Sequence, residues 1–120
     1  MSRANRILVV DDNASLRENL AEALQLEGYE VVVAADGAGA LALLEADPLP
    51  EVVLLDLVMP RMDGRELARR IRQDRRLDTV RLVLTTGHEA TARAGVAVEA
   101  VLMKPFGVGE LLEALKRVGA

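Results

Sequence analysis

The sequence predicts an α/β fold built on a parallel sheet, because short apolar runs alternate along the chain with helical patterns. Two of these runs, at residues 7–10 and 52–55, contain only Ile, Val and Leu, which is typical of parallel strands buried on both faces. Both runs lead directly into acid, at Asp11-Asp12 and at Asp56. Because parallel strands end at one edge of an open α/β sheet, these carboxylates are expected to meet there.

Each strand and helix is predicted from its own pattern. The expected strands cover residues 7–10, 31–34, 52–55, 82–85 and 98–103. Between the first two strands, leucines recur at helical spacing, with Asn13 or Ser15 available as the N-cap and Gly28 as the stop. The other expected helices cover residues 38–45, 66–72 and 108–118, and residues 89–95 leave room for about two helical turns.

The composition fits one globular domain, since the chain has 120 residues, of which 51% are hydrophobic and 28% charged. It contains no cysteine, which excludes disulfides and thiolate metal sites and is consistent with a reducing cytoplasm. The N-terminus resembles no signal peptide and no apolar run approaches about 18 residues, so we expect a cytoplasmic protein without a membrane partner. The net charge of −4 argues against nucleic-acid binding.

Positive charge is concentrated in one segment of the chain. Residues 61–81 hold eight arginines and four acids, a net charge of +4, which leaves −8 for the remainder of a chain whose total is −4. A solvated helix face is the ordinary explanation, and a partner-docking surface is the alternative. Nucleic acid is the least favoured partner, because aromatic stacking residues are nearly absent.

The acids at the strand ends predict a cation site. Two like charges about 4 Å apart repel by about 4 kcal/mol at an effective dielectric constant of about 20, so clustered carboxylates require a counterion. Mg²⁺ is a hard ion that takes carboxylate and phosphate oxygens. Asp56 could be a metal ligand, a nucleophile that forms an aspartyl phosphate, or both. For Asp11 and Asp12, capping of the next helix is the alternative role.

Two further strands end in residues that suit phosphate. Lys104 follows the last strand. The chain has only two lysines but thirteen arginines, which favours a specific role for the compact ammonium charge of Lys104 over that of an ordinary surface residue. Thr85 and Thr86 end the fourth strand. A threonine hydroxyl there can bond to a phosphoryl oxygen. The alternative is that threonine is present only because β-branched residues favour strands. The turn at residues 59–64 is expected to shape the loop around Asp56.

Several motifs together resemble the receiver domain of two-component response regulators. The matching pieces follow the order of that family and cover nearly the whole length. The resemblance implies a single receiver domain over residues 1–120, with a flavodoxin-like, doubly wound, five-stranded parallel sheet of order 2-1-3-4-5 and helices on both faces. The matching pieces are ILVVDDN at residues 7–13, GYEV at 28–31, AADG at 34–37, DLVMPRMDG at 56–64 and KPF at 104–106.

The resemblance also implies roles for the site residues. Asp56 is expected to be the phosphoacceptor, Asp12 a direct Mg²⁺ ligand, and Asp11 a ligand that acts largely through water. The backbone carbonyl of Val58 would complete the metal shell, in which Mn²⁺ can replace Mg²⁺, and Lys104 would bind the phosphoryl group. The implied phosphodonor is a phosphohistidine on a sensor histidine kinase or on a histidine phosphotransfer protein.

The implied function is that of a phosphorelay component rather than a turnover enzyme. Phosphorylation is expected to be self-catalysed, the acyl phosphate to hydrolyse slowly, and the change of state to reach a downstream protein. No direct nucleic-acid or membrane partner is expected, and the domain is expected to be a monomer or a weak dimer. The chain is either a free-standing receiver or one cut from a larger regulator or hybrid histidine kinase.

Some positions depart from the family pattern or leave a choice. Thr86 matches the switch threonine of the family better than Thr85, because a glycine follows it. Val101 stands where the family usually has Tyr or Phe, and the fourth helix is expected to be about one turn short. Two side chains, one two residues beyond the phosphoacceptor and one two residues beyond the switch threonine, are expected to tune the lifetime of the phosphate. They are Val58 and His88.

Three other functions are compatible with parts of the pattern. A phosphatase of the haloacid-dehalogenase type also uses an Asp after a strand, but it would carry a second Asp where Val58 stands. A flavin-binding protein would need hydroxyls and amides in its first loop, where Asp11 and Asp12 would repel phosphate. A pseudo-receiver that only binds partners is the remaining alternative, which the full set of charged site residues disfavours.

Overall fold

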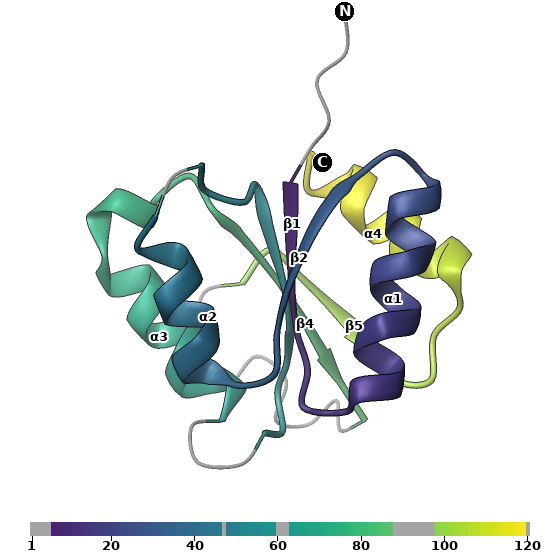
Figure 1. The fold of residues 1–120 in the computed structure, drawn as a ribbon, viewed down its shortest axis with the longest axis horizontal. Helices are drawn as coiled ribbons and strands as arrows, with labels where there is room; N and C mark the ends of the chain where they lie inside the picture. The colour runs from purple at the N-terminus through teal and green to yellow at the C-terminus, as the bar shows by residue number, and fades with distance from the viewer. Residues whose placement is uncertain (1–5, 47, 60–62, 88–97, 120) are drawn as a thin grey trace, which may run out of the picture.

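The computed structural model describes residues 6–46, 48–59, 63–87 and 98–119. Five parallel strands form one sheet in the order β2-β1-β3-β4-β5, which confirms the predicted fold class and strand order (Figure 1). Strand β1 pairs with both β2 and β3, so the direction of strand addition reverses at β1, where open α/β sheets commonly bind ligands. The strands are β1 (Arg6–Val10), β2 (Glu30–Ala34), β3 (Val52–Asp56), β4 (Arg81–Thr86) and β5 (Ala100–Met103).

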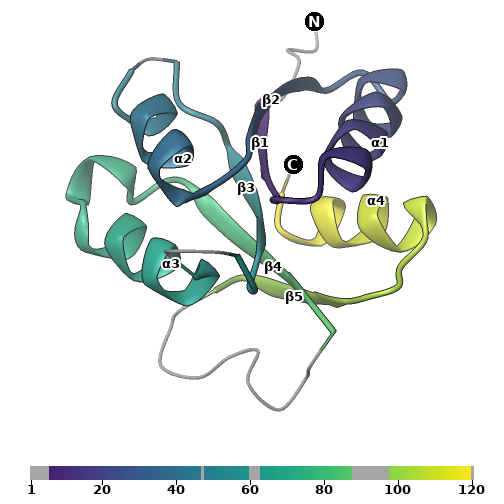
Figure 2. The same ribbon diagram turned by 60° about the horizontal axis from the view of Figure 1, so that its bottom comes forward.

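Helices cover both faces of the sheet. Helices α1 (Ala14–Leu26) and α4 (Val108–Arg117) lie on one face, whereas α2 (Gly37–Leu44) and α3 (Gly64–Gln73) lie on the other (Figures 1 and 2). A short 3₁₀ helix, η1 (Arg75–Leu77), follows α3. The short helix expected at residues 89–95 lies outside the described residues, so α4 denotes the last helix of the chain. Among the described helices, none combines the length and apolarity that crossing a membrane requires.

Successive side chains along each strand point to opposite faces of the sheet, so the core has two layers. In β1, Ile7 and Val9 pack under α1 and α4, while Leu8 and Val10 pack under α2 and α3. All five residues of the central strand β3 are buried. Burying each large apolar side chain contributes about 1.5–3 kcal/mol, and a shift of one residue would turn every side chain to the wrong layer. The two layers therefore fix the register that brings the strand ends together.

The two ends of α1 follow the predicted signals. Asn13, rather than Ser15, is the N-cap, and its side-chain oxygen accepts the N–H of Leu16 at 3.0 Å. Gly28 ends the helix with φ at +95°, a left-handed conformation that glycine adopts without steric cost.

Two predicted boundaries differ from the structure by two residues. Helix α3 begins before its predicted start at residue 66, because Asp63 caps it by accepting the N–H of Glu66 at 2.9 Å. Strand β5 begins after its predicted start at residue 98. The preceding Glu99 still donates its backbone N–H to the carbonyl of Leu82 at 2.9 Å, but the N–H of Leu82 donates to the Glu99 side chain, at 2.7 Å, rather than to a backbone carbonyl.

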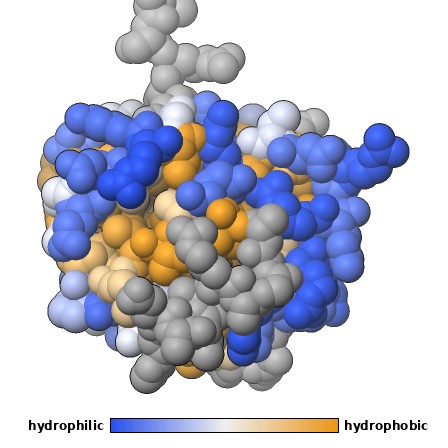
Figure 3. All heavy atoms as spheres, turned by 180° about the vertical axis from the view of Figure 1, so that it is seen from behind, coloured by the Kyte–Doolittle hydropathy of each residue, from blue (hydrophilic) through white to orange (hydrophobic). Residues whose placement is uncertain are grey.

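The arginine-rich segment supplies the charged outer side of α3 and η1. Arg69 and Arg70 are each about half exposed, and both pair with Glu66 of the same helix. Hydrophilic residues cover the α3 side of the molecule in the view from behind, beside an apolar area in the centre of that face (Figure 3). These ion pairs within one helix favour the interpretation of the segment as a solvated helix face.

Candidate functional site

Three charged side chains meet at the carboxyl edge of the sheet because each stands at the end of a strand. Asp56 is the last residue of β3, while Asp11 and Lys104 directly follow β1 and β5. Side chains alternate along a strand, and all three positions continue the row that packs under α1 and α4. The residues two positions earlier in that row are Val9, Leu54 and Leu102.

Lys104 joins the two buried acids of the site. Its Nζ atom lies 3.2 Å from Oδ1 of Asp56 and 3.5 Å from Oδ2 of Asp11. Only 6% of Asp56 and 2% of Asp11 are exposed, whereas Asp12 is exposed. One carboxylate oxygen from each of the three acids lies within 4.8 Å of the others. The acids predicted to meet at this edge therefore form one cluster, and Lys104 contacts it.

The buried position of Asp56 disfavours its charge. Burial raises the pKa of the Asp56 carboxyl, and the negative charge of Asp11 raises it further. The ammonium group of Lys104 and the N–H of Val58, which donates to Oδ1 at 3.4 Å, lower the pKa without cancelling the rise. The Asp56 carboxylate is therefore stabilised by any further positive charge placed beside it.

Hydrogen bonds hold the loop that carries Asp11 and Asp12. Oδ1 of Asp11 accepts the N–H of Asn13 at 2.9 Å, and Asn13 in turn caps α1. Arg17, in the first turn of α1, donates from Nη1 to the backbone carbonyl of Asp11 at 2.8 Å. Arg17 was not predicted as a site residue from the sequence. Its position was a signal, since a cation near the N-terminus of a helix is unfavourable unless it makes a compensating contact.

The loop after Asp56 depends on the close approach of Gly64. The N–H of Gly64 donates to the carbonyl of Leu57 at 2.7 Å. A β-carbon at Gly64 would lie 2.7 Å from Cα of Leu57 and closer still to the carbonyl oxygen of Asp56. Glycine therefore lets α3 start directly behind Asp56, as expected of the turn at residues 59–64, of which 60–62 lie outside the described residues.

Thr85 and Thr86 are both buried beside the cluster. Thr85 pairs with Asp56 in the β3–β4 ladder, so these two residues lie level across the sheet. Thr86 lies one residue nearer the sheet edge, and its carbonyl accepts the N–H of Lys104 at 2.7 Å. The register thus brings both residues to the sheet edge that carries the site, with Thr85 in the row of Asp56 and Thr86 in the opposite row. The preference for Thr86 as the phosphoryl-binding hydroxyl stays a prediction.

The other positions singled out in the sequence lie around this cluster or outside the described residues. Val101 pairs with Leu84 and packs, partly buried, against the core under α2 and α3. Thr86 follows Leu84 by two residues and so continues the same row as Val101. The side chain of Val58 is 65% exposed. His88 lies outside the described residues.

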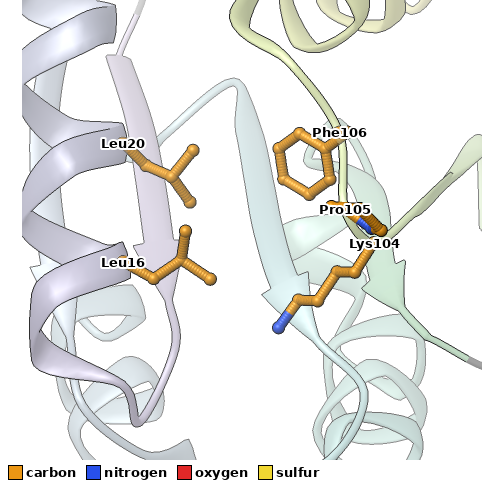
Figure 4. A pocket seen from close by; sticks show the side chains of 5 residues that line it. All are labelled: Leu16, Leu20, Lys104, Pro105 and Phe106. Carbon is orange, nitrogen blue, oxygen red and sulfur yellow. The ribbon is translucent and has the colours of Figure 1, made fainter.

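An apolar pocket of about 440 Å³ lies beside Lys104. Leu16 and Leu20 of α1 line one side, opposite Phe106 and Pro105, which follow β5 (Figure 4). The peptide bond between Lys104 and Pro105 is cis, as the sequence permits. Because Lys104 lines the pocket and also contacts Asp11 and Asp56, the pocket lies next to the acid cluster, on the side of α1.

The acid cluster suits a hard divalent cation. The donors that Asp11, Asp12 and Asp56 bring together are carboxylate oxygens, which Mg²⁺ and Mn²⁺ accept, and no His or Cys belongs to this described cluster. Burial, and then the charge of Asp11, raise the pKa of Asp56 despite the nearby Lys104, so a further cation beside this carboxylate would be favourable. The residues present therefore fit the predicted metal.

Comparison with known proteins gives one consistent family. A family model described as "Response regulator receiver domain" matches residues 7–116. "Response regulator MprA" of Mycolicibacterium vanbaalenii is 43% identical over 115 aligned positions, in a match that covers 92% of this chain and 48% of that protein. The protein of the same name from Mycobacterium avium is 41% identical over 115 aligned positions, in a match that covers 92% of this chain and 49% of that protein. The chain thus spans about half the length of the curated relatives it matches.

Solved structures agree over the whole fold. Vibrio cholerae chemotaxis protein CheY4 superposes with a TM-score of 0.89 and 32% identity, over 97% of this chain and 99% of that one. Response regulator protein TrrA of Thermotoga maritima, solved in complex with Mg²⁺-BeF, gives a TM-score of 0.82 and 35% identity, over 95% of this chain and 98% of that one. The chain belongs to the response regulator receiver domain family of two-component signalling.

Proposed function

We propose that this domain accepts a phosphoryl group on Asp56 and so acts as the switch of a two-component phosphorelay. The observation that carries the proposal is the buried Asp56 carboxylate, whose Oδ1 lies 3.2 Å from Nζ of Lys104 within a cluster of acids. A carboxylate fixed beside a cation can act as a nucleophile toward phosphorus, and Lys104 can then bind the charge that the phosphoryl group brings.

Asp11, Asp12 and Asp56 would hold Mg²⁺, or Mn²⁺ in its place, with the backbone carbonyl of Val58 as a further ligand. The bound metal would neutralise charge on the phosphoryl oxygens. Support comes from the all-carboxylate donor set and from the raised pKa of Asp56. The similar Thermotoga maritima protein was solved in complex with Mg²⁺-BeF, which is consistent with this assignment.

In the transfer step, a carboxylate oxygen of Asp56 attacks the phosphorus of a phosphohistidine. The P–O bond forms as the P–N bond breaks, and the imidazole leaves with the electron pair of that bond and takes up a proton from water. No general base is needed, because Asp56 reacts as the carboxylate. Lys104 and the hydroxyl of Thr86, preferred to that of Thr85, bind the phosphoryl oxygens. Water later cleaves the acyl phosphate slowly to carboxylate and inorganic phosphate. We infer from this slow hydrolysis that the domain is a phosphoacceptor with self-catalysed phosphorylation rather than a turnover enzyme.

The proposed donor is a sensor histidine kinase or a histidine phosphotransfer protein. A protein that brings a histidine to the buried Asp56 must also cover the surface around it. The pocket between Leu16 and Phe106 is the apolar part of that surface, and it shares Lys104 with the acid cluster. Apolar side chains of the donor would therefore fill this pocket while its histidine approaches Asp56.

The remaining properties of the domain follow the same proposal. It acts in the cytoplasm as a monomer or weak dimer and passes its state to a downstream protein, without binding nucleic acid or membrane itself. Because the chain spans about half of its curated relatives, any output activity of a longer protein would belong to a segment outside this domain.

The proposal is tested by incubation with acetyl phosphate and Mg²⁺, followed by measurement of hydroxylamine-labile phosphate. The wild type should take up label, Asp56→Asn should take up none, and Asp78→Asn, which makes the same change at an exposed residue beside η1, should match the wild type. No label on the wild type, or equal label on Asp56→Asn, would reject the phosphoacceptor role and leave a domain that only binds partners.

A further inference from the structure

We propose that Arg17 is a positioning residue for the carboxylates that follow β1, an inference that rests on the proposed metal site. Nη1 of Arg17 donates to the backbone carbonyl of Asp11 at 2.8 Å, in a partly buried contact. That carbonyl belongs to the peptide group that joins Asp11 to Asp12. This peptide group is shared by both acidic residues, and it is planar. By fixing its orientation, the contact with Arg17 restricts the directions of both side chains.

Helix stability does not explain an arginine at this position. The N-terminus of a helix carries partial positive charge, so a cation in the first turn is unfavourable by about 0.3–1 kcal/mol. Salt bridging does not explain it either, because Arg17 forms no ion pair within the described part of the chain. Its guanidinium binds a neutral carbonyl at the edge of an acid cluster, which points to control of loop geometry.

Asp12 is the residue that most needs this control. It is exposed, and its carboxylate has no hydrogen-bond or ion-pair partner among the described residues, so only the loop backbone directs it. The backbone is held on one side by the N–H of Asn13, which donates to Oδ1 of Asp11 at 2.9 Å. On the other side, Arg17 donates a hydrogen bond to the carbonyl of Asp11. Asp12, the proposed direct metal ligand, is thus oriented by a residue of α1.

The charge of Arg17 and its positioning role affect metal affinity with opposite signs. A nearby guanidinium repels a cation, so loss of the charge alone would tighten Mg²⁺ binding. Loss of an orienting contact would weaken it, because groups that orient metal ligands typically change affinity by 10-fold or more. The direction of the change in the dissociation constant therefore separates the two roles.

The experiment is calorimetric titration of Mg²⁺ into the unphosphorylated protein at fixed ionic strength. We expect the dissociation constant to rise about 10-fold in Arg17→Met and to recover in part in Arg17→Lys, which can still donate one hydrogen bond. Arg117→Met removes the same charge from α4, where the side chain is 71% exposed, and should leave the constant unchanged. An equal or tighter constant in Arg17→Met would overturn the proposal.

Amide hydrogen exchange of the metal-free protein gives a second measurement that requires neither metal nor phosphate. The N–H of Asn13 should exchange faster in Arg17→Met than in Arg117→Met, while amides in the middle of β1 keep their protection. Unchanged exchange at Asn13 would overturn the positioning role. Failure of the wild type to bind Mg²⁺ would overturn the proposed metal site and this inference together, whereas normal wild-type binding with an unaffected Arg17→Met would overturn the inference alone.

Discussion

Nζ of Lys104 lies 3.2 Å from Oδ1 of Asp56, although the two residues belong to strands that are not neighbours. Lys104 directly follows β5, and Asp56 is the last residue of β3. The ion pair crosses the end of β4, the strand that carries Thr85 and Thr86. Lys104 also lies 3.5 Å from Oδ2 of Asp11, so one ammonium group offsets two nearly buried carboxylates. The expected effects of substitutions at the site depend on this shortage of positive charge.

Replacing Lys104 by Met should destabilise the metal-free protein. The two buried carboxylates would lose their cation, and the free energy of unfolding at pH 7 should fall by about 1–3 kcal/mol, the usual cost of leaving a buried polar group without its partner. Lys116→Met, at an exposed residue in the last turn of α4, should change it by no more than about 0.5 kcal/mol. Urea denaturation measures both, and equal stability of the two variants would contradict the bridging role of Lys104.

The raised pKa of Asp56 predicts how stability depends on pH. Because the folded state holds this proton more tightly than the unfolded state, the contribution of Asp56 is present below its ordinary pKa and is lost as the pH rises through the folded value. Without divalent metal, Asp56→Asn should therefore be more stable than the wild type at pH 7, and the difference should disappear toward about pH 4. Denaturation curves across this range, with Asp78→Asn as control, test the sign. A less stable Asp56→Asn at pH 7 would show that Lys104 outweighs burial.

Gly64→Ala should distort the site from behind. The added β-carbon meets backbone atoms of Asp56 and Leu57, which cannot move aside as a flexible side chain would, so a loss of about 1–3 kcal/mol is expected. Gly109→Ala is the matched control, because a β-carbon there meets nothing within 4 Å and Ala favours a helix by about 0.5–1 kcal/mol. Thermal unfolding compares the two, and a neutral Gly64→Ala would contradict the close approach of α3 to β3.

Isosteric replacement of each threonine tests the choice of phosphoryl-binding hydroxyl. Thr86→Val should lower the affinity for beryllofluoride, a phosphoryl mimic, by about 10-fold, as expected for one hydrogen bond to a charged group. Thr85→Val should leave this affinity close to that of the wild type. The reverse order would move the role to Thr85, the residue that pairs with Asp56 in the sheet.

The pocket predicts a difference between protein and small-molecule donors. Leu16→Ala should slow phosphotransfer from a phosphorylated histidine phosphotransfer protein by about 10-fold, because the apolar surface around Asp56 is reduced. Labelling by acetyl phosphate should not change. Leu26→Ala removes the same side chain from the other end of α1, where it is 81% exposed, and should affect neither reaction. Equal loss with both donors would indicate damage to Asp56 rather than a contact with the donor protein.

The fold and the acid cluster could be predicted from the sequence because both follow from local patterns. Residues 7–10 of β1 and 52–55 of β3 are all apolar. Asp11 directly follows β1, and Asp56 is the last residue of β3. Because parallel strands end at the same edge of the sheet, the two acids can be placed together from the strand pattern alone, before side-chain geometry is known. Lys104 was predicted for the same reason.

Other features could not be predicted, because they depend on contacts between segments or on one atom of the backbone. The role of Arg17 rests on a hydrogen bond to the carbonyl of Asp11, which leaves no mark in the pattern of apolar residues. Just before β5, the N–H of Leu82 donates to the side chain of Glu99, while the N–H of Glu99 donates to the carbonyl of Leu82, and a bond from a side chain at this point leaves no mark in the strand pattern. Glycine at position 64 was expected as a turn residue, but its contact with the backbone of Asp56 appears only when α3 is packed.

The central claim is that Asp56 is the residue that carries the phosphoryl group, and mapping of the modified residue tests it most directly. After treatment with acetyl phosphate and Mg²⁺, borohydride reduction converts an aspartyl phosphate to homoserine, which mass spectrometry of peptides can locate. We predict homoserine at Asp56 and at neither Asp11 nor Asp12. Reduction product at another residue, or none in a folded protein that binds Mg²⁺, would contradict the claim.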